Sequence, residues 1–178
     1  MVKVYNFIAY GTDKDLGASY NDCMSLLNDE DWAVFIDHDA MFLEKYWYPR
    51  LTKLLEDNTQ YGLFTCLTNR VGCPWQVPQG VDKNNHDIRY HRSIADQFSK
   101  REEDLIINVT NAPALLSGVF LLVSKRTWDS IGGAKSGFLG VDNDLHKKCR
   151  EQNIQVGLLT NLYIYHWYRG DGDLSHLN

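Results

Sequence analysis

Two carboxylates, Asp37 and Asp39, stand one residue apart directly after the apolar segment Trp32–Ile36. This segment predicts a buried strand, and the polar run at 28–31 marks where it begins. Because side chains alternate along extended backbone, we expect Asp37 and Asp39 to point to the same side. Two carboxylates at the carboxyl end of a central strand suit a hard divalent cation that carries a phosphate-bearing ligand. The alternative is an ordinary polar strand end that turns into a loop.

The surrounding sequence predicts a chain in which strands and helices alternate. The first strand, the first helix and the strand before Asp37 make a strand–helix–strand unit. The usual handedness of such units implies that its two strands are parallel. The chain is therefore predicted to be an α/β protein. Besides the strand at 32–36, strands are expected at 2–10, 61–67, 115–124, 156–159 and 162–166, and helices at 16–28, 49–57, 88–104, 125–131 and 142–153.

Two long loops accompany these elements. The segment 68–87 holds many turn-forming residues, and long loops in compact domains are often functional. The segment 132–140 contains four glycines and must be flexible or turn tightly. We interpret 73–111 as an insertion or acceptor-side segment and 170–178 as a mobile tail, within one domain that spans 1–178.

Composition limits the classes of protein to consider. The 178 residues are 44% hydrophobic and 23% charged, which is ordinary for one globular domain and argues against disorder. A net charge of −5 gives no support for binding nucleic acid. The four cysteines form no Cys-X-X-Cys pair, which favours reduced thiols in an intracellular protein. No apolar run approaches the ~20 residues that span a bilayer, so we expect a soluble, cytoplasmic protein without a transmembrane segment.

Five short motifs occur in a characteristic order: 18–21 (ASYN), 35–39 (FIDHD), 132–133 (GG), 138–145 (FLGVDNDL) and His166. Together they resemble the nucleotide-sugar glycosyltransferases of the GT-A fold, especially the large inverting family 2. The resemblance covers about 2–169. Two features depart from the family pattern: the usual second strand–helix–strand unit is absent, and Val141 replaces a glutamate. The small size is similar to that of such domains in large DNA viruses of algae, for which the host cytoplasm would be the location.

The resemblance implies a single GT-A (Rossmann-like) α/β domain with a mostly parallel mixed central sheet flanked by helices. It also implies a metal-dependent transfer of a sugar from a nucleotide-diphosphate sugar to a hydroxyl of a glycan or glycoconjugate. A UDP-sugar is the favoured donor and a GDP-sugar the second choice, with Mn2+ or Mg2+ as cofactor. Inversion at the anomeric carbon follows from the family alone.

The same resemblance gives roles to individual residues. Asp39 would bind the metal on the diphosphate, Asp37 would contact the ribose or the metal, and His166 would be a third ligand. A neutral imidazole can complete a carboxylate-rich site for Mn2+; the alternative for His166 is a buried histidine satisfied by a neighbour. Asp142 would be the general base that takes the acceptor proton. Asp142 and Asp144 equally suit the positive end of a helix dipole.

Further residues are expected to contact substrates. Those after the first strand lie where ligands bind in open α/β sheets, although ordinary loop residues are the competing interpretation. His38 is expected to point away from its two neighbours. The nucleotide-sugar candidates are Tyr10, Gly11, Thr12, Asp13, Lys14, Asn21, Asp37, His38, Arg70, Ser117, Gly118, Asp144 and Arg169; the acceptor candidates are Trp75, Gly140 and Val141.

Three other functions stay open at this point. Acidic strand ends also serve metal-dependent phosphohydrolases, although Met41 stands where the haloacid-dehalogenase pattern has threonine. A nucleotidyltransferase would need a Gly-rich Arg/Lys loop after the first strand, which this sequence lacks. The third is a non-catalytic module that binds nucleotide sugars or carbohydrates.

Overall fold

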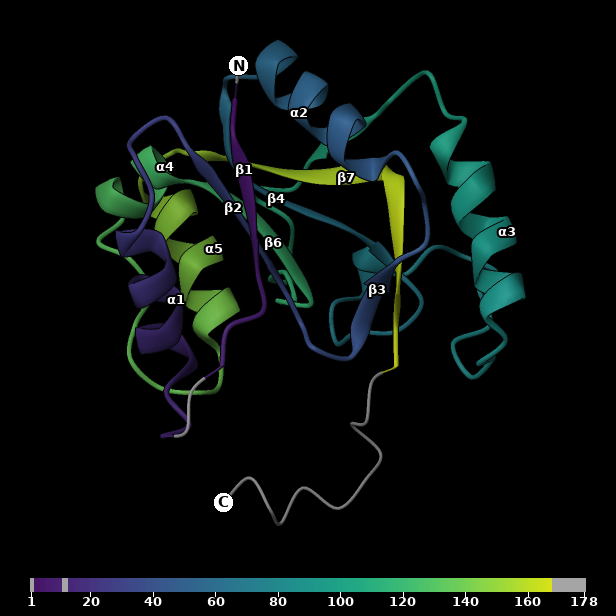
Figure 1. Ribbon diagram of the computed structural model, residues 1–178, viewed down its shortest axis with the longest axis horizontal. Coiled ribbons are helices and arrows are strands. Elements are labelled where there is room, and N and C mark those ends of the chain that lie inside the picture. The colour runs from purple at the N-terminus through teal and green to yellow at the C-terminus, as the bar shows by residue number, and fades with distance from the viewer. Residues whose placement is uncertain (1, 11–12, 168–178) are drawn as a thin grey trace.

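A mixed seven-stranded β-sheet forms the centre of the protein (Figure 1). The structure is a computed structural model that describes residues 2–10 and 13–167. The strand order is β1-β2-β6-β4-β7-β3, with β5 also paired to β7. The strands are β1 (Val4–Phe7), β2 (Trp32–Ile36), β3 (Ala40–Phe42), β4 (Tyr61–Thr68), β5 (Ile106–Asn108), β6 (Phe120–Ser124) and β7 (Gln155–His166).

Helices cover both faces of this sheet. They are α1 (Leu16–Ser25), α2 (Trp47–Asp57), α3 (Ile88–Ser99), α4 (Lys125–Ser130) and α5 (Val141–Glu151), with a short 3-10 turn η1 (Pro74–Gln76). In Figure 1, α1, α4 and α5 gather at the left, whereas α3 stands apart at the right. Among the described residues, no helix is long and apolar enough to cross a membrane.

Strand alternation divides the core into two layers. In β2, Ala33 and Phe35 join a layer with α1, α4 and α5, whereas Val34 and Ile36 join a layer with α2. All five residues of β2 are buried, as the uniformly apolar sequence predicts for a strand covered on both faces. The α/β class and the helix-flanked mixed sheet are thus confirmed.

The sheet is less parallel than expected. Of the six pairings among the described strands, β1–β2 and β4–β7 are parallel and the other four are antiparallel. The prediction of a mostly parallel sheet is therefore wrong. The reason is that β6 lies antiparallel between β2 and β4, and the short strands β3 and β5 both run antiparallel to β7.

Several element boundaries also differ from the sequence-based expectations. The two strands expected at 156–159 and 162–166 are one strand, β7, in which a register shift against β4 absorbs the interruption near Asn161. The strand expected at 115–124 begins only at Phe120, so Ser117 and Gly118 lie in the loop before it. The expected helix over 88–104 ends at Ser99, and β3 and β5 were not predicted.

Asp15 ties the start of α1 to the glycine-rich loop. Its carboxylate accepts hydrogen bonds from the backbone N–H of Ala18 and of Gly137, each at 2.8 Å, and from the Ser136 hydroxyl. The first bond caps the helix, and the other two hold the loop against it. Gly17 permits this close approach, because a Cβ there would lie 1.8 Å from the carbonyl oxygen of Lys135.

Candidate metal centre and adjoining carboxylate

A tight turn, rather than extended backbone, brings Asp37 and Asp39 together. The Ala40 N–H donates to the Asp37 carbonyl at 3.0 Å, which closes a β-turn between β2 and β3. The Asp37 N–H donates to the Val119 carbonyl at 3.1 Å and anchors the turn to the loop before β6. The expectation that the two side chains share a side is correct in outcome, but strand alternation is the wrong reason.

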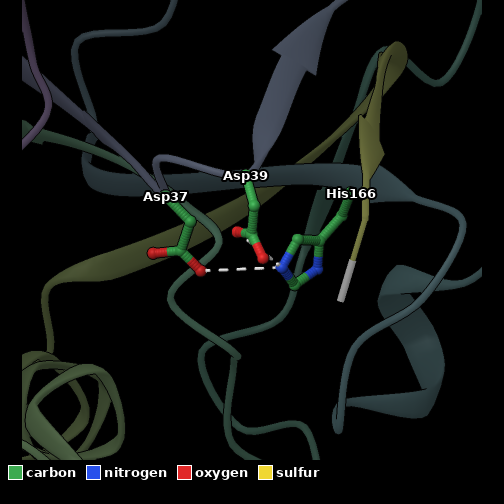
Figure 2. A group of neighbouring side chains, drawn as sticks. All are labelled: Asp37, Asp39 and His166. Carbon is green, nitrogen blue, oxygen red and sulfur yellow. Dashed lines mark ion pairs between the residues drawn. The ribbon is translucent and has the colours of Figure 1, made fainter. Parts of the chain in front are cut away.

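The turn delivers both carboxylates to His166. Because β3 is antiparallel to β7 with Ala40 opposite His166, residues just before β3 lie beside the end of β7. His166 Nε2 is 3.4 Å from Asp39 Oδ1 and 3.8 Å from Asp37 Oδ2 (Figure 2). One potential ligand atom from each residue lies within 4.8 Å of the others. Asp39 and His166, more than a hundred residues apart in the sequence, thus lie side by side in the fold.

The His166 ring is oriented by backbone groups behind it. Nδ1 lies 2.8 Å from the carbonyl oxygen of Arg70, which can only accept, so Nδ1 carries the proton. Nε2 is thereby left to face the two carboxylates. In the neutral ring the lone pair of Nε2 points at the negative oxygens of Asp37 and Asp39. A proton or a metal cation between Nε2 and these oxygens would stabilise this arrangement. Histidines that bind metals commonly show this second hydrogen bond to a carbonyl.

Two hydrogen bonds with the Asn69 side chain fix the backbone of His166. Its side-chain oxygen accepts the His166 N–H at 2.7 Å, and its nitrogen donates to the His166 carbonyl at 3.0 Å. Asn69 is fully buried at the end of β4. Sequence reasoning did not find it, because a single asparagine after a strand resembles any turn residue and nothing in its spacing marks a contact 97 positions away.

The charges of the cluster shift one another. Burial raises the pKa of Asp37 to about 6, although His166 opposes that shift; Asp39, and more weakly Asp142, add to it. The pKa of Asp39 is lowered, chiefly by the hydrogen bond with His166. Burial alone would lower the pKa of His166, but Asp39, the Arg70 carbonyl and Asp37 together raise it above its ordinary value. Such mutual perturbation is typical of functional sites.

Asp142 lies near this cluster at the start of α5. The Gly118 N–H donates to its Oδ2 at 2.7 Å, and the Asn143 N–H donates to its Oδ1 at 2.8 Å. A Cβ on Gly118 would approach the Asp142 Cβ to 2.9 Å, so glycine is needed for this contact. Asp142 is only partly buried, and its charge contributes to the raised pKa values of Asp37 and Tyr20.

A buried glutamine holds the loop that contacts Asp142. The Ser117 N–H donates to Gln76 Oε1 at 2.7 Å, and Gln76 Nε2 donates to the Ser117 carbonyl at 3.1 Å and to Thr65 Oγ1 at 2.8 Å. The Ser117 hydroxyl itself accepts from the Cys73 N–H at 3.0 Å. Gln76 was not predicted, since a glutamine in a turn-rich loop usually faces solvent.

Three other residues that were expected to contact substrates form hydrogen bonds or ion pairs within the protein. The Asn21 amide forms two hydrogen bonds with the Ala134 backbone, both at 3.0 Å, and accepts the Trp128 indole N–H at 3.1 Å. Asn21 therefore holds the glycine-rich loop, and its contact with a nucleotide sugar stays a prediction. Asp144 pairs with Lys148 at 3.0 Å on the same helix. Trp75 donates its indole N–H to the Ala114 carbonyl at 2.9 Å.

The remaining candidates lie in varied places. Val141 is 1% exposed and packs in the core, so its side chain is unavailable to an acceptor, contrary to expectation. Gly140 precedes α5 with φ 69°, a left-handed conformation that suits glycine. Tyr10 is 87% exposed beyond β1, and His38, Asp13 and Lys14 are also exposed. Gly11, Thr12, Arg169 and the expected tail at 170–178 lie outside the described residues.

Comparison with known proteins leaves the geometry as the guide to function. The sequence matches no protein-family model, and no curated protein matches it.

Proposed function

We propose that the protein is a metal-dependent glycosyltransferase that moves a sugar from a nucleotide-diphosphate sugar to a hydroxyl group of a glycan or glycoconjugate. The observation that carries this proposal is a cluster of three potential metal ligands that lies near a separate carboxylate. Asp37, Asp39 and His166 offer three ligand atoms within 4.8 Å. Asp142 stands apart from them, held by the Gly118 backbone and near enough for its charge to raise the pKa of Asp37.

Asp37, Asp39 and His166, called the acidic trio from here on, fit a divalent cation. Two carboxylates and one imidazole are a donor set suited to Mn2+, and Mg2+ accepts the carboxylates with additional water or phosphate ligands. A bound cation would neutralise charge that builds up on the departing nucleoside diphosphate. Arg70 and Asn69 then have the task of keeping His166 Nε2 directed at the cation.

Asp142 would carry the proton in the transfer. As the acceptor oxygen forms its bond to the anomeric carbon, the bond from that carbon to the diphosphate breaks and Asp142 takes the hydroxyl proton. The Gly118 N–H at 2.7 Å fixes one oxygen of Asp142 and leaves its orientation set before substrate binds. Inversion at the sugar is the stereochemistry expected of a direct displacement with a base on the acceptor side.

A thermal-shift screen of UDP-, GDP- and dTDP-sugars, each with and without Mn2+, tests the donor class. A ligand at 100 times its Kd stabilises the folded state by about 2.7 kcal/mol, which raises Tm. Because the proposed metal binds the diphosphate, a true donor is expected to raise Tm only when Mn2+ is present. Asp142→Asn is expected to keep this shift and to lower the rate of sugar transfer by about 100-fold or more. The matched control is Asp22→Asn, an exposed carboxylate on α1.

The outcomes separate the competing functions. No Mn2+-dependent shift with any nucleotide sugar contradicts the proposal. Donor binding without transfer or donor hydrolysis points to a non-catalytic binding module. Release of inorganic phosphate from simple phosphate esters points to a phosphohydrolase.

A further inference from the structure

A second concave site lies between α2 and the end of α3, away from the acidic trio. It has a volume of about 460 Å³, within the usual range for small-molecule sites. Arg50 and Lys53 of α2 line one wall and Arg101, just after α3, lines another. Tyr61 at the start of β4 and Asn161 within β7 also line the pocket. Tyr61 begins β4, whereas Asn69 follows its other end beside His166, so β4 separates the two sites by its whole length.

The charge of this pocket is opposite to that of the chain. Three cations, Arg50, Lys53 and Arg101, line it against the single carboxylate of Asp57, although the chain carries a net charge of −5. A neighbouring hollow of about 640 Å³ shares Arg50 and has two further cations, Lys45 and Arg92, against Glu44 and Asp96. The first pocket, with three cations to one carboxylate, has the larger excess of positive charge, which favours an anionic ligand.

The pocket wall is fixed by Arg50. Its guanidinium donates to the Ser99 carbonyl at 3.1 Å and the Asn161 carbonyl at 2.6 Å, and it pairs with Glu44 at 2.8 Å. These bonds join α2 to the end of α3 and to β7. Arg50 is thus committed to the wall, whereas Lys53 is exposed and forms no ion pair among the described residues. The Arg101 guanidinium lies 4.2 Å from the ring centre of Phe98, which holds it in place at the rim.

Polar and aromatic groups beside the cations suit a ring with hydroxyl groups. Tyr61 is half-buried, packs its ring against Phe64 at 5.2 Å and leaves part of the ring exposed to the pocket. Asn58, whose side-chain nitrogen donates to the Leu54 carbonyl at 2.9 Å, and Gln60 also line the pocket with amide groups. An aromatic face with amides can hold a hydroxylated ring, while the cations hold its charge.

We propose that this pocket between α2 and α3 is a second binding site, and that its ligand is a sugar carrying a phosphate or a carboxylate group. The anion lies against Lys53 and Arg101, and the ring lies against Tyr61. The site uses none of the residues of the acidic trio. It therefore stands whether or not the protein is a glycosyltransferase.

Isothermal titration with glucose 6-phosphate, glucuronate, glucose and inorganic phosphate tests this site. The full chain is used in EDTA, so that metal at the acidic trio contributes nothing. We expect at least one of the two anionic sugars to bind more tightly than both glucose and inorganic phosphate. Binding of only glucose 6-phosphate or only glucuronate assigns the anion as phosphate or carboxylate, respectively.

Variants that reverse or remove a positive charge locate the binding. Lys53→Glu is expected to weaken the anionic sugar by at least about fivefold, and Arg101→Gln by a smaller factor. Lys147→Glu, an exposed lysine on α5, is the matched control and should change nothing. Asp39→Ala should also keep full affinity, which separates this site from the trio. Equal affinity for glucose or inorganic phosphate, or unchanged affinity in a folded Lys53→Glu variant, would overturn the proposal.

Discussion

Two buried histidines, His146 and His166, show how similar burial can serve different purposes. His146 Nδ1 accepts the Leu116 N–H at 3.0 Å, and Nε2 donates to the carbonyls of Val109 and Thr110 at 3.2 and 3.1 Å. Both nitrogens are thus satisfied by backbone. In His166, by contrast, Nδ1 donates to the Arg70 carbonyl at 2.8 Å, and Nε2 faces Asp37 and Asp39.

The pKa values of the two histidines move in opposite directions. Burial lowers the pKa of His146 and the charge of Arg150 adds to this shift, although the hydrogen bonds to the Thr110 and Val109 carbonyls oppose it. The carboxylates around His166 outweigh burial and raise its pKa. A histidine enclosed by backbone links loops to a helix, whereas one whose second nitrogen faces two carboxylates can bind a cation. The geometry of the second nitrogen, and not burial, separates the two roles.

The strongest test of this contrast removes an acidic neighbour of His166. Asp39→Ala is expected to weaken Mn2+ binding by at least about 100-fold, because one ligand of three is lost and outer-shell losses alone cost about 10–100-fold. Calorimetric titration with MnCl2 measures the change, with Asp22→Asn as the control. Affinity within a factor of two of the unmodified protein would mean that the trio is not a metal site.

Exchanging each histidine for leucine should separate stability from metal binding. His146→Leu leaves a buried N–H and two carbonyls without their partner, which costs about 1–3 kcal/mol of unfolding free energy. Its Mn2+-dependent stabilisation should be unchanged. His166→Leu should instead lose that stabilisation. Urea unfolding with and without Mn2+ measures both quantities, and the comparison fails if the two variants behave alike.

The pH dependence of the metal-free protein should differ at the two sites. The folded-state pKa of Asp37 is about 6, above its ordinary value of 3.8, so its contribution to stability is lost as the pH rises through that window. His146 has a lowered folded-state pKa, so its contribution is lost as the pH falls below its ordinary value of 6.5. Asp37→Asn and His146→Leu should each flatten one of these slopes in urea unfolding between pH 4 and pH 8. A slope that either variant leaves unchanged belongs to another group.

Much of this contrast could not be predicted from the sequence. The strand before Asp37 and the placement of Asp142 at a helix start were predictable, because hydrophobic periodicity and glycine spacing are local signals. The pairing of β3 with β7, which brings His166 to Asp37, is non-local, and the three residues of β3 carry no strand pattern of their own. Asn69 and Gln76 act through single long-range hydrogen bonds that leave no periodic trace. The hydrogen bonds that join Asn21 to the Ala134 backbone were not predicted for the same reason.

The twelve-residue strand β7 has a consequence for the order in which the protein folds. It follows the other described strands along the chain, yet β3, β4 and β5 all pair with it. During synthesis, β1 and β2 can pair early, but β3 and β5 must wait for β7 to emerge, and pairings between distant segments are slow to form. His166 sits at the far end of that strand. Assembly of the acidic trio is therefore coupled to completion of the sheet, and a nascent chain that has not placed β7 holds two carboxylates without their histidine.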